Sequence, residues 1–177
     1  MDVEPTDIPG LYIVRPKVFA DERGTFVKTF HEERFKELGL GAPAEEFFST
    51  SARSVIRGMH LQIPPHATTK CVCCLSGAVL DVVLDLRTHT DSYGKIFTRE
   101  LTPKTFEMLF IPDGCAHGFL SLTDASMMFY QMSDVYAPNE DVGVRWDSFG
   151  FNWPVVNPII STRDQALPAL SDFVSPF

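Results

Sequence analysis

The clearest pattern in this 177-residue sequence is Ala78-Val79-Leu80-Asp81-Val82-Val83-Leu84-Asp85-Leu86, in which acidic residues interrupt an apolar, β-branched run. A short run of this kind that follows a Ser-Gly turn signal is typical of a strand in a buried sheet. Similar β-rich runs occur at 11–14, 25–30, 47–50, 96–101, 106–111, 117–122 and 127–132. Turn-forming residues separate these runs at short intervals. The sequence therefore predicts an all-β sandwich or jelly roll.

Only a small part of the chain departs from this β pattern. Residues 31–38, with charged positions around Phe35, predict one short helix. After Tyr136 the sequence is rich in Pro, Asn, Asp and Trp and has no clear period, which predicts an irregular C-terminal segment over the sheets. The length is that of one domain, and we find no repeat or linker. We therefore expect a single domain over residues 1–177.

Composition excludes several classes of protein. The chain is 45% hydrophobic and 21% charged, and its apolar runs are far shorter than the roughly 20 residues of a membrane helix. The acidic start, Met1 to Pro5, does not resemble a signal peptide, so we expect a cytoplasmic protein. The net charge of −8 argues against a nucleic-acid partner. A small phosphorylated ligand remains compatible, because Arg23, Arg57 and Lys70 could hold it locally.

The cysteines favour a structural role. Cys71 and Cys74 form a C-x-x-C spacing, but no second pair follows, and residues 70–75 have the pattern of a buried strand. We expect these two residues, with Cys73 and Cys115, to be reduced and to pack as small apolar side chains.

Chemically useful side chains gather in a few short segments. Arg57-Gly58-Met59-His60, Lys70, the segment 112–117 and Tyr130 together supply a base, cations, a second imidazole and a phenol. These groups can remove a proton beside a carbonyl, stabilise the enolate and return a proton. Each also has a structural interpretation. His117 and Tyr130 could be core residues, Arg57 and Lys70 ordinary charges, and Asp164 a turn or cap residue in the segment 161–164.

Two of these segments resemble cupin motifs. Pro112-x-Gly114-x-x-His117 is similar to the second cupin motif, in which a tight turn precedes a histidine that faces the barrel interior. Arg57-Gly58-Met59-His60 stands where the first motif is expected. Metal-binding cupins have a His-x-His pair and a glutamate there, whereas this chain continues His60-Leu61-Gln62. We therefore expect a cupin jelly roll without a metal site, and a metal-dependent oxygenase or isomerase is the alternative.

Nearly the whole chain resembles one cupin family, the dTDP-4-dehydrorhamnose 3,5-epimerases of deoxysugar biosynthesis. The resemblance rests on matching segments at 19–26, 55–62, 77–87, 111–119, 134–138, 153–154 and 160–164, with Lys70 and Tyr130. It implies a homodimer that acts without a cofactor on a nucleotide-linked 4-keto-6-deoxyhexose. It also implies a place in the synthesis of a rhamnose-like sugar for a surface polysaccharide or another glycosylated product.

The resemblance also implies roles for particular residues. A C4 ketone acidifies the hydrogens on C3 and C5, so that one base and one acid can invert either carbon. His60 would be the base with Asp164 as its partner, Tyr130 the proton donor, and Lys70 the cation beside the enolate oxygen. The substrate-binding set implied by the resemblance comprises Phe19, Arg23, Phe26, Lys28, Arg57, His117, Tyr136, Asp141 and Arg163. Of these, Arg23 and Arg57 would bind the pyrophosphate, His117 the sugar or phosphate region, and Tyr136 the base by stacking.

The chain departs from the family pattern on the nucleotide side. Lys28 replaces a glutamate, and a Gln-x-Asn element is replaced near Phe48-Ser49-Thr50. The sequence thus leaves dTDP, CDP and GDP open as the nucleotide, and it leaves open whether C3, C5 or both carbons are inverted. A sugar-nucleotide binding module that moves no proton is the remaining alternative.

Overall fold

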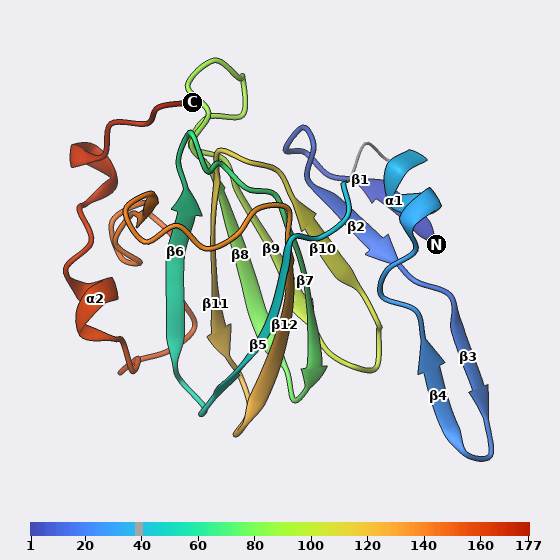
Figure 1. Cartoon of the computed structure of the whole chain (residues 1–177). Helices are drawn as coiled ribbons and strands as arrows, with labels where there is room; N and C mark the ends of the chain where they lie inside the picture. The colour runs from blue at the N-terminus through green and yellow to red at the C-terminus, as the bar shows by residue number, and fades with distance from the viewer. Residues whose placement is uncertain (38–40) are drawn as a thin grey trace.

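The computed structural model describes residues 1–37 and 41–177 and consists mainly of two antiparallel sheets that face each other, a cupin-type jelly roll (Figure 1). The six-stranded sheet has the order β1 (Asp2–Pro5), β2 (Tyr12–Arg15), β10 (Met108–Ile111), β7 (Lys70–Ser76), β12 (Ser126–Met132) and β5 (Glu45–Ser51). The five-stranded sheet has the order β13 (Asp141–Gly143), β6 (Ile56–Gln62), β11 (Cys115–Ser121), β8 (Val79–Asp85) and β9 (Ile96–Leu101). The all-β prediction is confirmed.

Strand β8 shows how the pleat distributes its residues. Val79 and Val83 belong to the core between the two sheets, while Val82 and Leu84 lie on the outer face of the five-stranded sheet. Both faces are covered, which explains why the strand is apolar at nearly every position. Asp81 lies midway between Val79 and Val83 in the strand's alternation, so its side chain also points inward, and it is completely buried. This carboxylate therefore lies inside the sandwich.

The C-terminal segment covers the outer face of the five-stranded sheet, as Figure 1 shows beside β6. Val144, Phe149 and Trp153 are buried in this second core, and the Trp153 indole donates a hydrogen bond to the carbonyl of Trp146. The prediction of an irregular segment over the sheets is confirmed. The segment also contains α2 (Thr162–Gln165) and the 3₁₀ turn η1 (Leu170–Asp172), which the sequence analysis did not predict.

The predicted helix corresponds to α1 (Glu32–Glu37), whose buried Phe35 packs on the outer face of the six-stranded sheet; Leu38 lies outside the described residues. The predicted strand at 96–101 coincides with β9, and the run at 25–30 ends early, at Val27. Strands β1, β3 and β13 were missed because they are short and carry acidic residues. In the described parts of the chain, the helices are too short and too polar to cross a membrane.

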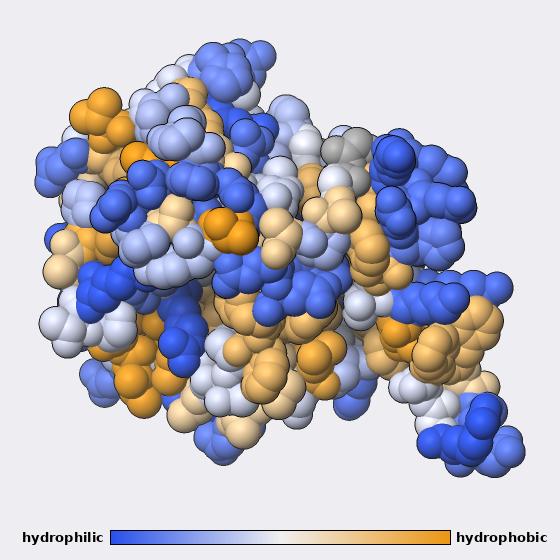
Figure 2. Space-filling view, in the orientation of Figure 1, coloured by the Kyte–Doolittle hydropathy of each residue, from blue (hydrophilic) through white to orange (hydrophobic). Residues whose placement is uncertain are grey.

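One element stands apart from the sandwich. Strands β3 (Val18–Asp21) and β4 (Gly24–Val27) form a two-stranded hairpin that projects from the body of the molecule (Figures 1 and 2). Phe19 and Phe26 lie opposite each other on it and are 47% and 58% exposed. These two large aromatic side chains form an exposed apolar patch on the projecting ribbon.

Candidate active site

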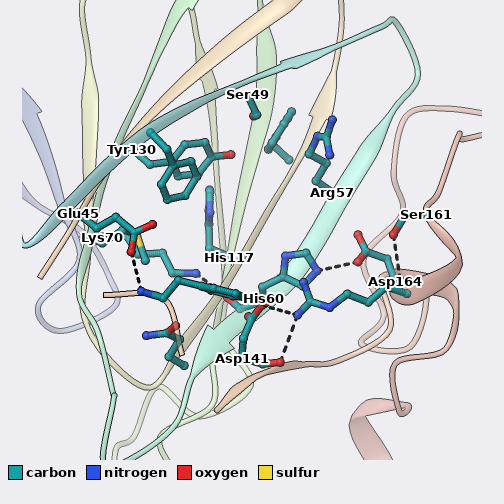
Figure 3. Close-up of a pocket in the computed structure, with 16 residues that line it drawn as sticks. Glu45, Ser49, Arg57, His60, Lys70, His117, Tyr130, Asp141, Ser161 and Asp164 are labelled. Carbon is teal, nitrogen blue, oxygen red and sulfur yellow. Dashed lines mark hydrogen bonds and ion pairs between the residues drawn. The ribbon is translucent and has the colours of Figure 1, made fainter. Parts of the chain in front are cut away.

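A cavity of about 440 Å³ lies between the two sheets. Its walls come from β5, β7 and β12 on one side and β6 and β11 on the other, and residues of the segment around α2 also line it. Figure 3 shows Tyr130, Lys70, His117 and His60 around the same space. The volume is within the usual range for a small-molecule site.

A bulge in β6 brings His60 into this cavity. Arg57 and His60 both line it, although residues three apart on a regular strand face opposite sides. The register between β6 and β11 shifts at this point, and Gly58 has φ +129°. A Cβ on Gly58 would come within 2.5 Å of the Gly118 Cα, so two facing glycines allow the close approach.

His60 forms a hydrogen bond with Asp164. Its Nε2 is 2.8 Å from Oδ1 of the carboxylate, and Oδ2 accepts a hydrogen bond from the backbone N–H of Gly58. Burial alone would raise the pKa of Asp164, but the hydrogen bond and charge of His60, together with the contacts of Gly58 and Ser161, lower this pKa below its usual value. An ionised carboxylate only accepts, so Nε2 carries the hydrogen and Nδ1 has the free lone pair. The Nδ1 atom is therefore the basic atom of the site.

Asp164 is held in place by its own helix. It lies on α2, where Ser161 is the N-cap and its hydroxyl accepts a hydrogen bond from the Asp164 backbone N–H. The structure thus combines both interpretations of the segment 161–164. The serine provides the local cap, and the aspartate side chain is left free to reach His60.

Lys70 is a buried cation beside the histidine. Its Nζ donates a hydrogen bond to the carbonyl of His60, at 3.0 Å. Burial lowers the pKa of Lys70 to about 8, and the negative charges of Asp141 and Asp81 oppose this shift. The ammonium group is therefore charged at neutral pH and close to its titration point.

His117 forms a second histidine–carboxylate pair. It lies opposite His60 on the adjacent strand, and its Nε2 is 2.9 Å from Oδ2 of Asp81. Both side chains are buried. Oδ1 of Asp81 has no hydrogen-bond partner among the described residues, so this carboxylate retains a free acceptor next to the cavity.

Tyr130 reaches the cavity from the six-stranded sheet. Burial raises its pKa, and the negative charge of Asp81 adds to that effect, so the phenol stays protonated at neutral pH. The ring of Phe47 stacks on it with centroids 4.6 Å apart and an interplanar angle of 14°. The His117 ring meets it edge-on at 6.1 Å.

Charged residues also surround the cavity entrance. Arg57 donates hydrogen bonds to the Ser51 hydroxyl and to the Thr50 carbonyl. Arg163 forms an ion pair with Asp141 at 2.7 Å. The backbone N–H of Tyr136, whose side chain lines the cavity, donates to a carboxylate oxygen of Glu45. The structure thus groups nine of the predicted site residues around one cavity: His60, Tyr130, Asp164, Lys70, Arg57, His117, Tyr136, Asp141 and Arg163.

Four predicted substrate-binding residues do not line this cavity. Phe19, Arg23 and Phe26 lie on the projecting hairpin, and Lys28 follows it as an exposed residue. Arg23 is 83% exposed and forms an ion pair with Asp21 of the same hairpin. These residues lie on or beside an element that extends away from the sandwich (Figure 1), and their binding of substrate stays a prediction.

In the segment Phe48-Ser49-Thr50, where the sequence departs from the family pattern, only Ser49 lines the cavity. The β5 side chains that line the cavity are Glu45, Phe47 and Ser49, and Phe48 faces the other way with 65% exposure. Alternation along the strand explains the difference, since neighbouring residues face opposite sides of the sheet.

Glu45 and Phe47, which line the cavity, and Asp81, which contacts His117 beside it, were not predicted from the sequence. An acidic residue with inward parity in an otherwise apolar strand was the available signal for Asp81. Glu45 and Phe47 gave no such signal, because the sequence of an edge strand does not show which of its faces points inward until its neighbouring strand is known. Among the described residues, no group of three or more His, Cys, Asp or Glu side chains could hold a metal ion. His60 and His117 each use one ring nitrogen to contact a carboxylate.

Comparisons with known proteins agree with this geometry. The family model described as dTDP-4-dehydrorhamnose 3,5-epimerase matches residues 5–172. A dTDP-4-dehydrorhamnose 3,5-epimerase of Shigella flexneri is 37% identical over 169 residues, which are 93% of each chain. A dTDP-4-dehydrorhamnose 3-epimerase of Streptomyces niveus is 34% identical and covers 93% of this chain and 82% of its own.

A solved structure is similar over nearly the whole chain. The dTDP-6-deoxy-D-glucose-3,5-epimerase of Legionella pneumophila, in complex with dTDP-4-keto-L-rhamnose, has a TM-score of 0.92 and 30% identity. The match covers 98% of this chain and 94% of that structure.

Proposed function

Because this chain belongs to the dTDP-4-dehydrorhamnose 3,5-epimerase family, we propose that its single domain epimerises a dTDP-linked 4-keto-6-deoxyhexose by moving a proton next to the C4 ketone. One observation carries the proposal. The His60–Asp164 pair and the phenol of Tyr130 reach the cavity from opposite sheets. Inversion of a carbon requires a base on one face and an acid on the other.

The proposed reaction has two steps. Nδ1 of His60 removes the proton from C3 or C5, and the C–H electron pair becomes the enolate while negative charge develops on the C4 oxygen. The Lys70 ammonium stabilises this charge, since it is buried and close to His60. Tyr130 then donates its proton to the opposite face of the same carbon, and the tyrosinate and imidazolium that remain return to their starting states by proton exchange with water. Asp164 stabilises the imidazolium throughout, and neither step needs a cofactor.

The substrate-binding roles follow from position. Arg57 lines the cavity near its entrance and can donate to the pyrophosphate, and His117 can contact the sugar or phosphate region. Tyr136 is 58% exposed at the cavity wall and offers a ring on which the base can stack. Asp141 and Arg163, which are paired to each other, complete the entrance.

We further propose that the protein works as a homodimer in the cytoplasm. The hairpin holds the exposed Phe19 and Phe26 away from the cavity of their own chain, and so we infer that it completes the site of a partner subunit together with Arg23 and Lys28. Closed two-fold dimers place the same element of each chain against the other. The four buried, free cysteines suit a reducing compartment.

We propose dTDP as the nucleotide, because the relatives named above act on dTDP sugars. CDP and GDP are the alternatives that the sequence left open; they rested on Lys28, which we assign to the partner's site, and on the segment with Phe48, a residue that does not line the cavity. A calorimetric titration should give dTDP at least tenfold tighter binding than CDP or GDP, a difference of about 1.4 kcal/mol. Equal affinities would return the nucleotide to an open question.

The experiment that tests the function is incubation with dTDP-4-keto-6-deoxyglucose in deuterated water, followed by NMR at C3 and C5. We expect deuterium with inverted configuration at one or both carbons, and the pattern distinguishes a 3-epimerase from a 3,5-epimerase. Binding without any exchange would instead indicate a non-catalytic module. Exchange that requires a stoichiometric metal in the purified protein would support the metal-dependent alternative.

A further inference from the structure

The aromatic residue Phe47 occupies an unusual place in the catalytic cavity. It lies on β5, the edge strand of the six-stranded sheet, directly opposite Tyr130 of β12 in the antiparallel register. Side chains opposite each other in such a pair project from the same face of the sheet. Phe47 and Tyr130 therefore enter the cavity together, and Phe47 remains 42% exposed.

The two rings form a close stack. Their centroids are 4.6 Å apart and their planes differ by only 14°. Tyr130 and His117 form a T-shaped contact, at 6.1 Å and 67°. The phenol thus contacts two rings, one stacked and one T-shaped, which limits rotation about its side-chain bonds. An acid that must deliver a proton to one face of one carbon needs this kind of restraint.

We propose that Phe47 is the positioning residue of Tyr130 and that it thereby sets how the returned proton is divided between C3 and C5. The inference rests on the proposed function. C3 and C5 flank C4, so a hydroxyl held in one place reaches one carbon better than the other in any given pose of the sugar. A phenol without the stack samples more orientations, returns protons less efficiently and discriminates less between the two carbons.

The chain supplies a matched control at the next residue. Phe48 is on the same strand but on the other face, does not line the cavity and is 65% exposed. Phe47→Leu and Phe48→Leu therefore make the same chemical change on opposite faces of β5. Phe47→Tyr keeps an aromatic ring for stacking and serves as the rescue variant. Phe47 is part-exposed on an edge strand, so these substitutions leave the core between the sheets intact.

The first measurement is the deuterium experiment with each variant. In Phe47→Leu we expect the yield of epimer per proton exchanged to fall about fivefold, because the variant loses one stacked aromatic pair. KM should stay within about twofold of its value in the unmodified protein. The ratio of deuterium at C3 to that at C5 should shift as well. Phe47→Tyr should restore both quantities, and Phe48→Leu should change neither. An unchanged ratio and yield with a raised KM would make Phe47 a binding residue and overturn the proposal, as would an equal effect of Phe48→Leu.

A second measurement does not depend on activity. Protein labelled with fluorotyrosine gives a fluorine NMR resonance for Tyr130 that Tyr130→Phe identifies by its loss. Phe47→Leu removes a ring from the face of the phenol and should move or broaden this resonance, whereas Phe48→Leu should leave it in place. A resonance that is unaffected by Phe47→Leu excludes the positioning role even in an inactive protein. Absence of exchange in the unmodified protein would overturn the proposed function instead.

Discussion

His60 is the residue on which the proposed chemistry depends most directly. Asp164 holds its Nε2, which leaves Nδ1 as the basic atom in the cavity. We predict that His60→Ala abolishes deuterium exchange at both carbons, because the same base serves both positions. Nucleotide affinity, measured by calorimetry, should stay within about threefold, since the nucleotide-side residues are untouched. Exchange at a normal rate would disprove the assignment.

Substitution of Tyr130 distinguishes proton removal from proton return. Tyr130→Phe keeps the ring that packs on Phe47 but loses the hydroxyl. Enolate formation by His60 can continue, whereas proton delivery to the new face slows. We therefore predict that the rate of epimer formation falls at least tenfold more than the rate at which the original hydrogen is lost. NMR of product and recovered substrate gives both rates. Equal losses would indicate that the tyrosine positions the sugar.

Lys70 makes the reaction sensitive to alkaline pH. Burial lowers its pKa to about 8, so the cation that stabilises the enolate disappears above that pH. We predict that kcat/KM falls above about pH 8, and that Lys70→Gln is slow but lacks this alkaline decline. The phenol of Tyr130 does not contribute there, because burial raises its pKa.

The pH dependence of folding stability provides a control for the Lys70 prediction. Between about pH 8 and its ordinary value of 10.5, the folded state binds fewer protons at Lys70 than the unfolded state does. This group's contribution to the free energy of unfolding therefore increases with pH across that range. The loss of activity should precede any loss of far-ultraviolet circular dichroism. A decline that coincides with unfolding would contradict the catalytic explanation.

At the scale of the element, the bulge in β6 depends on Gly58. An added Cβ would meet the Gly118 backbone at 2.5 Å, and the positive φ disfavours any side chain. We predict that Gly58→Ala lowers the free energy of unfolding by about 3 kcal/mol or more in urea denaturation. Gly94→Ala is the matched control, because that glycine also has a positive φ but open space around it, and it should cost only about 1 kcal/mol. Equal costs would show that the contact between β6 and β11 is unimportant.

At the scale of the whole molecule, the hairpin predicts complementation between subunits. Arg23→Ala should impair the partner's site, while His60→Ala inactivates its own. When the two inactive variants are unfolded together and refolded, half of the dimers are mixed and each has one intact site, so about a quarter of the normal activity should return. Each variant refolded alone is the control. No recovery would place Arg23 outside the partner's site.

Much of this protein could be predicted from local sequence. The alternation in 78–86 and the turns between apolar runs identified an all-β fold, because the two-residue period of a strand can be recognised from consecutive residues. The residue types at His60, Lys70 and Tyr130 suggested proton transfer beside a carbonyl, because few side chains can act as base, cation and acid at neutral pH. The order of the motifs indicated the family.

Only the tertiary structure determined which of these side chains meet. Arg57 and His60 share a face because a bulge between two glycines changes the strand's parity, and such a bulge depends on the neighbouring strand. Asp164 reaches His60 across more than a hundred residues, and Phe47 rather than Phe48 faces Tyr130 because of the register of β5 on β12. The hairpin with Phe19, Arg23 and Phe26 projects away from the cavity of its own chain, and only the tertiary structure shows this. Contacts between distant segments depend on register, closure and packing, none of which is encoded in the spacing of residues along the chain.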